Sequence, residues 1–433
     1  MANDKDFLVN GPVVVGKDTK VTVGSITSSD IDLSTGNYFD DTLAANTTYT
    51  ISNAGDVQAF QLEVTGGTAE VLSNFSTTLY TGNATARTIT NGIDLANDGG
   101  LVWVKSRSSR NHILSDTERG TGKVLFSNLD IAEDADTTTI TSYNSDGFTM
   151  DSSALKMNTN GEDFVSWTFK KAAGFFDVVT WTGNSTARAI SHNLGCEVGS
   201  IFIKRVNSAN EWVVYHRSMA NNEALTLNTS DAKLSPRTFF DNTTPTSTEF
   251  YLSAGDSAVN GSGFTYVAYL FAHDDAADGL IQCGSYTGNG STDGPEINLG
   301  WEPQWVMIKR ATGGTGSWMM SDSMRGVVTG GNDAYLQANL TNAEAGTFDS
   351  IDFNSEGFKI KTTFSSWNTS GDTYIYVAIR AASDPDITWP SSIEWAGGIA
   401  PSAPATGETD VFTFTTDDGG TTYTGIQSID NAS

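Results

Sequence analysis

The chain has 433 residues, more than a single hydrophobic core usually serves, so we expect several domains. Hydrophobic residues make up 38% of it and charged residues 17%, and much of the remainder is Gly, Ser, Thr, Asn and Asp, as is typical of short strands joined by tight turns. The formal net charge of −27 argues against wrapping of nucleic acid or binding to an anionic bilayer.

Residues 1–73 are expected to form an N-terminal β module. Residues 48–51 and 59–64 alternate apolar and polar side chains with period two, and further β-prone runs lie at 7–10, 13–15, 21–23, 31–33 and 36–39. The first residues contain no basic region followed by an apolar stretch, and 18 consecutive apolar residues occur nowhere. We therefore expect no secretion signal and no membrane insertion.

A short motif recurs three times, at intervals of about 100 residues, which is the size of a compact domain. Its copies are Tyr80-Thr-Gly-Asn83, Trp181-Thr-Gly-Asn184 and Tyr286-Thr-Gly-Asn289. Each is followed by an apolar strand that ends in Lys, at Lys105, Lys204 and Lys309, and each repeat closes with an aromatic strand, at 164–169, 266–271 and 374–379. Each repeat therefore begins and ends with the same kind of element.

Turn signals lie between these landmarks. Asn144-Ser-Asp-Gly-Phe148 and Asn354-Ser-Glu-Gly-Phe358 occupy matching places in the first and third repeats, and Asn160-Gly161, Asn260-Gly261 and Ser370-Gly371 precede the closing strands. We interpret residues 74–174, 175–280 and 281–385 as three independent β-sandwich repeats, jelly-roll-like, that share one fold. Loops, and not strands, should carry whatever differs in their binding.

Residues 386–433 are expected to form a C-terminal linker and hairpin. The stretch 390–404 is rich in Pro, Ala and Gly, and strands at 411–415 and 421–424 are joined through Asp417-Asp-Gly-Gly420. The fold class predicted for the whole chain is all-β.

Two segments outside the repeats resemble known proteins. Ile31-Asp-Leu-Ser-Thr-Gly-Asn-Tyr-Phe39, with the runs at 44–51 and 59–64, is similar to the N-terminal β module of tail-fibre-like proteins of marine cyanophages and related bacteriophages. Trp389-Pro-Ser-Ser-Ile-Glu-Trp-Ala-Gly-Gly398 and the run at 409–420 resemble the C-terminal tail of the same group. The three repeats are similar to an uncharacterised repeat of such virion proteins.

The resemblance implies a virion structural protein, a tail fibre or appendage that attaches the particle to the host surface and is assembled in the host cytoplasm. Residues 1–73 would then attach it to the particle. The implied partners are other phage structural proteins and a host cell-surface polysaccharide or protein. The alternative is a capsid decoration or tail-adaptor protein without a receptor role, and the third hypothesis is a polysaccharide depolymerase. Because strand edges in segments such as 7–64 need partners, we also expect a homotrimer.

We expect no enzyme activity. His112, His192, His216 and His273 are the only neutral-pH bases, and none lies in a recognised nucleophile–base pattern. The nearest approaches are His216 beside Ser218, and Gly255-Asp-Ser257, which has the form of an esterase start. A pair of carboxylates could cleave glycosides, but their separation cannot be read from a sequence.

No cofactor and no metal site is expected. Cys196 and Cys283 are too few and too far apart to announce disulfides or a metal knuckle, and we take them as reduced. Clustered acids could hold Ca²⁺, either Asp274 with Asp275 or Asp130 with Glu133 and Asp134, although neither set has EF-hand spacing.

Aromatic residues are the candidate binding groups, since exposed rings can stack on sugars or contact partner proteins. Most tryptophans of the repeats should fill cores, including Trp103 and Trp305, which we place at equivalent positions of the apolar strand. Trp301 and Trp367 stand in turn-like contexts, so we predict that these two are exposed and bind. The repeats also contain Trp181, Trp212 and Trp318.

Overall fold

The fold is described on a computed structural model, in which the chain divides into two compact units. Unit 1 comprises Met1–Glu70 and Ser383–Ser433, and unit 2 comprises Val71–Ala382. The structure describes residues 26–27, 29–34, 37–42, 47–54, 58–65, 73–154, 156–276, 279–381, 387–396, 398–401, 403 and 409–429. The expected strands at 7–10, 13–15 and 21–23 lie outside these residues. The prediction of an all-β fold is confirmed.

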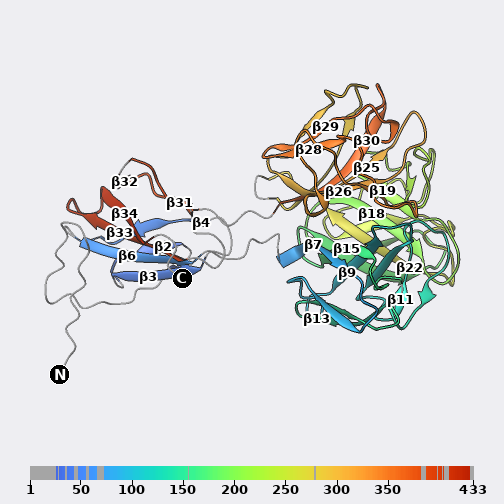
Figure 1. The fold of residues 1–433 in the computed structure, drawn as a ribbon, viewed down its shortest axis with the longest axis horizontal. Coiled ribbons are helices and arrows are strands. Elements are labelled where there is room, and N and C mark those ends of the chain that lie inside the picture. The colour runs from blue at the N-terminus through green and yellow to red at the C-terminus, as the bar shows by residue number, and fades with distance from the viewer. Residues whose placement is uncertain are drawn as a thin grey trace. The chain divides into compact units, whose positions relative to one another are not determined.

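Unit 1 is built from both ends of the chain. Its strands are β1 (Ile26–Thr27), β2 (Asp30–Asp32), β3 (Tyr38–Thr42), β4 (Thr47–Thr48), β5 (Thr50–Ser52), β6 (Gln58–Thr65), β31 (Ile387–Thr388), β32 (Ile393–Trp395), β33 (Thr409–Thr416) and β34 (Tyr423–Ile429). The larger sheet has the order β3-β6-β33-β34-β32, and the smaller sheets are β1-β2-β5 and β31-β4. Figure 1 shows β6 and β33, from opposite ends of the chain, side by side.

The terminal segments are therefore not separate parts. The expected hairpin is present as β33 and β34, but β33 also pairs with β6 over its whole length, from Thr409 opposite Thr65 to Thr416 opposite Gln58. Both strands bury alternate residues in one core, which includes Phe60 and Phe414 with ring centroids 4.8 Å apart. Period-two alternation in a sequence indicates that a strand has a buried face, but it does not identify the partner strand.

The predicted linker also contributes to this core. The ring of Trp389 lies 4.8 Å from that of Phe412, and its Nε1 donates to the carbonyl of Pro401 at 2.8 Å. A Pro-rich stretch is extended because proline fixes its backbone, and here the extended chain packs through its aromatic residues.

Unit 2 contains the three repeats. The first has β7 (Phe75–Thr81), β8 (Arg87–Thr90), β9 (Gly100–Ser106), β10 (His112–Asp116), β11 (Lys123–Val124), β12 (Asp134–Ala135), β13 (Ile140–Asn144), β14 (Gly147–Met150) and β15 (Asp163–Lys170). The second has β16 (Phe176–Thr182), β17 (Arg188–Ser191), β18 (Val198–Arg205), β19 (Val213–His216), β20 (Leu225–Thr226), β21 (Glu249–Leu252) and β22 (Thr265–Ala272). The third has β23 (Ile281–Thr287), β24 (Glu296–Asn298), β25 (Pro303–Arg310), β26 (Met319–Asp322), the 3₁₀ turn η1 (Ser323–Arg325), β27 (Leu336–Gln337), β28 (Ile351–Asn354), β29 (Gly357–Ile360), α2 (Ser365–Asn368) and β30 (Thr373–Arg380).

The three repeats share one strand order, as predicted. Their larger sheets read β7-β15-β9-β10, β16-β22-β18-β19-β20 and β23-β30-β25-β26-β27, and their smaller sheets read β8-β14-β13, β17-β21 and β24-β29-β28. The second repeat lacks the third strand of the smaller sheet, in agreement with the missing Asn-Ser-acid-Gly-Phe element in its sequence. The repeat motif therefore marks a common fold.

Strand register gives the exact correspondence between repeats. Lys105 lies opposite Val165, Lys204 opposite Val267 and Lys309 opposite Ile375. The residues two positions before these lysines are Trp103, Phe202 and Met307, which are therefore equivalent. Trp305 lies four positions before Lys309 and corresponds to Leu101. The predicted equivalence of Trp103 and Trp305 is therefore wrong by two residues, although both are fully buried as expected.

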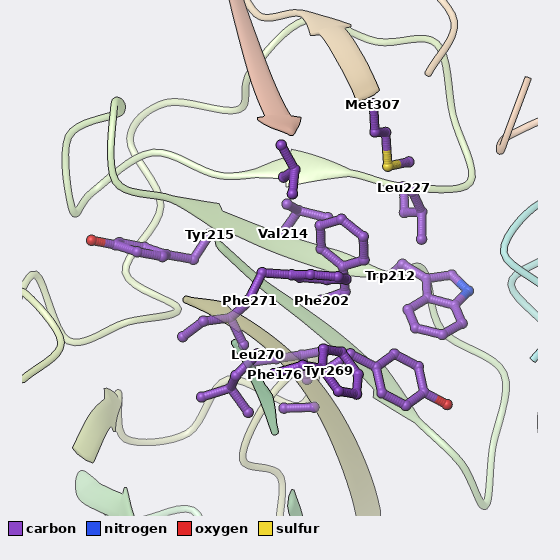
Figure 2. Packing of buried hydrophobic residues seen from close by; sticks show 14 of the residues in the cluster. Phe176, Phe202, Trp212, Val214, Tyr215, Leu227, Tyr269, Leu270, Phe271 and Met307 are labelled. Atoms are coloured by element: carbon purple, nitrogen blue, oxygen red, sulfur yellow. The ribbon is translucent and has the colours of Figure 1, made fainter. Parts of the chain in front are cut away.

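The repeats are not independent, contrary to the prediction, because they share a core. In β9, Val102 and Val104 face the repeat's own smaller sheet, whereas Leu101 and Trp103 enter a central cluster that collects side chains from all three repeats. β25 divides in the same way. Figure 2 shows Met307 of the third repeat beside residues of the second, including Phe202 and Leu227. Burial on both faces explains why these strands are continuously apolar.

Candidate functional site

The two tryptophans predicted to be exposed are buried. Trp301 is 4% exposed and Trp367 is 1% exposed, and both belong to the core between the sheets of the third repeat. Trp367 lies on α2, whose short turn folds the ring inward. The turn-like sequence context was identified correctly, but it does not determine which way a large apolar ring points. The prediction of exposure is therefore wrong.

The repeated Tyr/Trp-Thr-Gly-Asn motif forms a buried latch in every repeat. Its aromatic residue donates to a main-chain carbonyl: Tyr80 to Met157 at 2.8 Å, Trp181 to Val259 at 3.0 Å and Tyr286 to Trp367 at 2.7 Å. Its glycine lies so close to a neighbouring loop that an added Cβ would meet a carbonyl oxygen at 2.1–2.2 Å in all three repeats. The motif is thus explained by packing.

A buried asparagine closes each latch, and the sequence reasoning did not identify its role. The side-chain oxygens of Asn158, Asn260 and Asn368 accept from the backbone N–H of the motif's own asparagine, at 3.1, 3.2 and 2.7 Å. Asn260 also donates to Thr186 and Ser253 carbonyls. Asn260-Gly261 was noticed as a turn signal, but the latch residue of the first repeat is Asn158 and not Asn160.

A ring of hydrogen bonds joins the repeats to one another. His112, Trp212 and Trp318 occupy the same position, one in each repeat. The Trp212 ring donates to the Phe126 carbonyl of the first repeat and Trp318 to the Thr226 carbonyl of the second, both at 3.0 Å. His112 Nε2 lies 3.0 Å from the Gln337 carbonyl of the third. The carbonyls are equivalent too, so the three contacts run in one direction and close a pseudo-threefold ring.

Backbone hydrogen bonds between the repeats follow the same cyclic pattern. Glu133 N–H donates to the Val206 carbonyl at 2.7 Å, and Lys233 N–H donates to that of Ala311 at 2.9 Å. The third bond, also 2.9 Å, runs from Glu344 N–H to the Arg107 carbonyl. We call these contacts, together with the three ring contacts, the inter-repeat seams.

Buried charges lie along the same seams. In the first repeat, Asp116 forms an ion pair with Arg119 at 2.5 Å and accepts a hydrogen bond from Tyr269 of the second repeat. In the third repeat, Asp322 forms an ion pair with Arg325 at 2.7 Å and accepts a hydrogen bond from Trp167 of the first repeat. The equivalent position in the second repeat is His216, whose Nε2 lies 3.0 Å from the Tyr376 carbonyl of the third. Each seam therefore carries a buried polar contact at one corresponding place.

His112 and His216 are fixed as neutral rings. A carbonyl can only accept, so Nε2 carries the proton in both, and Nδ1 accepts from Trp103 in one and from the Ser218 backbone N–H in the other. Burial lowers the pKa of His216 to about 4 and lowers the pKa of His112 well below its usual value. Both nitrogens of each ring are engaged, so these histidines serve the seams.

The other groups considered for catalysis lie in local structure. Ser218 meets His216 only through its backbone N–H, and the Asp256 carboxylate accepts from Ala258 N–H in a turn. His273 accepts from Cys283 N–H at 3.2 Å, and His192 accepts from Leu194 N–H at 3.3 Å. The absence of enzyme activity stays a prediction.

The acids considered for Ca²⁺ are used separately. Glu133 binds Arg119 at 2.9 Å and Asp134 binds Lys156 at 2.6 Å, while the Asp274 carboxylate accepts from Ala276 N–H. Within the described ranges, no group of three His, Cys, Asp or Glu residues could hold a metal ion. Cys196 and Cys283 are free thiols, and burial raises the pKa of Cys283. No helix in the described part of the chain is long and apolar enough to span a membrane.

One aromatic surface is exposed on the third repeat. Phe364, which precedes α2, is 48% exposed, and its ring centroid lies 6.1 Å from that of half-buried Phe348. Phe348 in turn lies 5.6 Å from Tyr335, which contacts buried Trp367 at 6.1 Å. We call Phe364, Phe348 and Tyr335 the Phe364 patch. The sequence reasoning placed a binding residue three positions away, at Trp367.

Comparisons with known proteins match unit 2 to a protein family. A protein-family model described as "Domain of unknown function (DUF7483)" matches residues 72–383, almost the whole of that unit. A search of curated proteins finds no match. A solved structure described as "Crystal Structure of the STIV MCP", a viral major capsid protein, has 7% identity and a TM-score of 0.15 over 76% of this chain and 92% of that one. A TM-score this low carries no argument.

Proposed function

The chain belongs to the DUF7483 family, whose description names no activity, and we propose that it is a structural protein of a bacteriophage particle, a tail fibre or appendage that attaches the particle to the host surface. The observation that carries the proposal concerns unit 1. Both segments that resemble the ends of phage tail-fibre-like proteins, 31–64 and 389–420, contribute strands to its one larger sheet. The two terminal segments of the resemblance therefore belong to one folded unit.

The division of the chain supports separate tasks for its two units. The family model ends where unit 2 ends, so unit 1 is a discontinuous module into which the family domain is inserted. Unit 1 would hold the protein on the particle through other phage structural proteins. Unit 2, a compact unit with seams and a shared core, is suited to presenting loops to a partner.

Antibody labelling of intact particles tests the proposal. An antibody raised against residues 71–382 should decorate the tail or its appendages in negative-stain images. Label absent from particles would overturn the virion assignment. Label spread over the head would instead favour the alternative, a capsid decoration protein without a receptor role.

The depolymerase hypothesis has its own test, because cleavage of a polysaccharide creates new reducing ends. Purified full-length protein incubated with host envelope polysaccharide should release none above a boiled control. Release that saturates with substrate would replace the binding function with an enzymatic one.

A further inference from the structure

Resting on the proposed host-surface function, we propose that the Phe364 patch binds a neutral saccharide, with a sugar ring stacked on Phe364. The patch is found in only one of the three repeats. Phe364 lies four residues before the latch asparagine, and each repeat has an equivalent position. In every repeat the carbonyl of that residue accepts a backbone N–H from the latch asparagine or from the residue directly before the asparagine. The equivalents of Phe364 are Ala154 and Asp256, and those of Tyr335 are Val124 and Ala224.

Backbone hydrogen bonds fix the loop that carries Phe364. Phe364 N–H donates to Thr362 Oγ1 at 3.1 Å, and its carbonyl accepts from Trp367 and Asn368 at 2.9 Å each. Asn368 is the buried latch residue, so the loop under Phe364 is fixed to the core of the repeat. A loop held in this way needs little ordering when a ligand stacks on the ring that it carries.

The size of the patch favours a sugar over a protein. A stable protein interface buries about 800 Å² on each partner and has few charges at its centre. The patch offers one exposed phenyl ring beside two rings that are already half-buried, and Asp349 follows Phe348 directly in the chain. One exposed aromatic face with polar groups at its border is enough for a single sugar ring.

The charges near the patch favour a neutral ligand. One Asp349 oxygen is buried without a hydrogen-bond partner, and burial together with Asp352 and Asp333 raises the pKa of this carboxyl. Lys361, three residues before Phe364 in the chain, is paired with Asp352 at 3.5 Å. An anionic ligand would be repelled by these acids and by a chain of formal net charge −27, whereas a neutral ligand would not.

Saturation-transfer NMR on the full-length chain tests the inference. The probes are hexasaccharides of glucose, mannose, galactose and N-acetylglucosamine, with hexagalacturonate as the anionic comparison. At least one neutral probe should bind at millimolar concentration and hexagalacturonate should not. Phe364→Ala should weaken that binding at least tenfold, while Ile131→Ala, which shortens another exposed apolar side chain, should leave it unchanged.

Three results would overturn the saccharide site: no neutral probe binds, hexagalacturonate binds best, or Phe364→Ala binds as the wild type does while remaining folded by circular dichroism. If Phe364→Ala instead abolishes only the co-purification of another phage protein, the patch is a protein contact and the saccharide assignment fails. Particle labelling is independent of these results. Label on the tail without sugar binding would remove only this inference, and sugar binding without label on particles would remove only the virion function.

Discussion

At the scale of single residues, the polar groups inside unit 2 serve structure and follow the repeat. The latch asparagines occur in all three repeats, whereas the seam position held by Asp116 and Asp322 is His216 in the second. A buried neutral histidine makes folding sensitive to acid, because the ring must stay uncharged to keep both of its contacts.

Unit 2 should lose stability in acid through His216. The unfolded chain protonates this ring near pH 6.5, but the folded protein does so only near pH 4. The unfolded state therefore binds more protons in that window, and the free energy of unfolding should fall as the pH drops through it, by roughly 3 kcal/mol at about 1.4 kcal/mol per pKa unit. Urea titrations at pH 7, 5.5 and 4 measure it.

His216→Gln is the matched variant for this prediction, since a Gln side chain can donate to the Tyr376 carbonyl and does not titrate. The fall in stability between pH 6.5 and 4 should become smaller than in the wild type. An unchanged fall would mean that other groups cause it.

Removing a latch asparagine should destabilise unit 2 strongly. Asn260→Ala deletes three hydrogen bonds of a fully buried side chain and leaves their backbone partners without it, so we expect a loss of about 3 kcal/mol. Thermal and chemical unfolding measure it. Asn342→Ala, on the exposed surface, should stay within about 0.5 kcal/mol of the wild type. Equal effects of the two substitutions would refute the latch.

At the scale of elements, the apolar strands of the larger sheets serve two cores at once. In the first and third repeats, alternate residues of the apolar strand face the repeat's own smaller sheet and the central cluster, so one strand links packing within a repeat to packing between repeats. The seam hydrogen bonds fix how the repeats are oriented at this apolar contact, because a buried N–H must find an acceptor.

Two Trp→Phe substitutions test the seam, because both remove the same atoms from a buried side chain. Trp212 Nε1 donates across the seam to Phe126, whereas buried Trp305 Nε1 has no partner. Trp212→Phe should therefore cost about 1–2 kcal/mol more than Trp305→Phe, because only the former removes a buried hydrogen bond between repeats. Denaturant midpoints at equal m-values compare the two variants. A larger cost for Trp305→Phe would contradict the role given to the seam.

At the scale of the whole molecule, the three repeats of unit 2 form a closed ring. Every repeat contacts both other repeats through equivalent seams. The second face of each larger sheet is covered by side chains of the other repeats. A shared core makes folding cooperative across its parts.

Residues 71–382 expressed without unit 1 should therefore unfold in a single transition, coincident by tryptophan fluorescence and circular dichroism. Residues 175–280 alone should not fold, since the side chains of the central cluster would be left in water. A stably folded single repeat would return the molecule to three independent sandwiches.

The homotrimer remains a prediction for the full-length chain. Light scattering at micromolar concentration should give about three times the chain mass of 46.1 kDa. A monomeric mass would contradict it and would leave threefold arrangement as a property of the repeats inside one chain.

The sequence by itself determined the all-β class and the position of the long apolar and aromatic strands in each repeat. Apolar runs, terminal lysines and the Tyr/Trp-Thr-Gly-Asn motif are local signals of register and turn, and they located the larger sheets. They could not determine what each face packs against. Trp301 and Trp367 sit in turn-like sequence yet point inward, and β33 pairs with β6 across more than 300 residues. Only the tertiary structure decided these points, because the partner of a buried face is set by packing between segments that are distant in the chain.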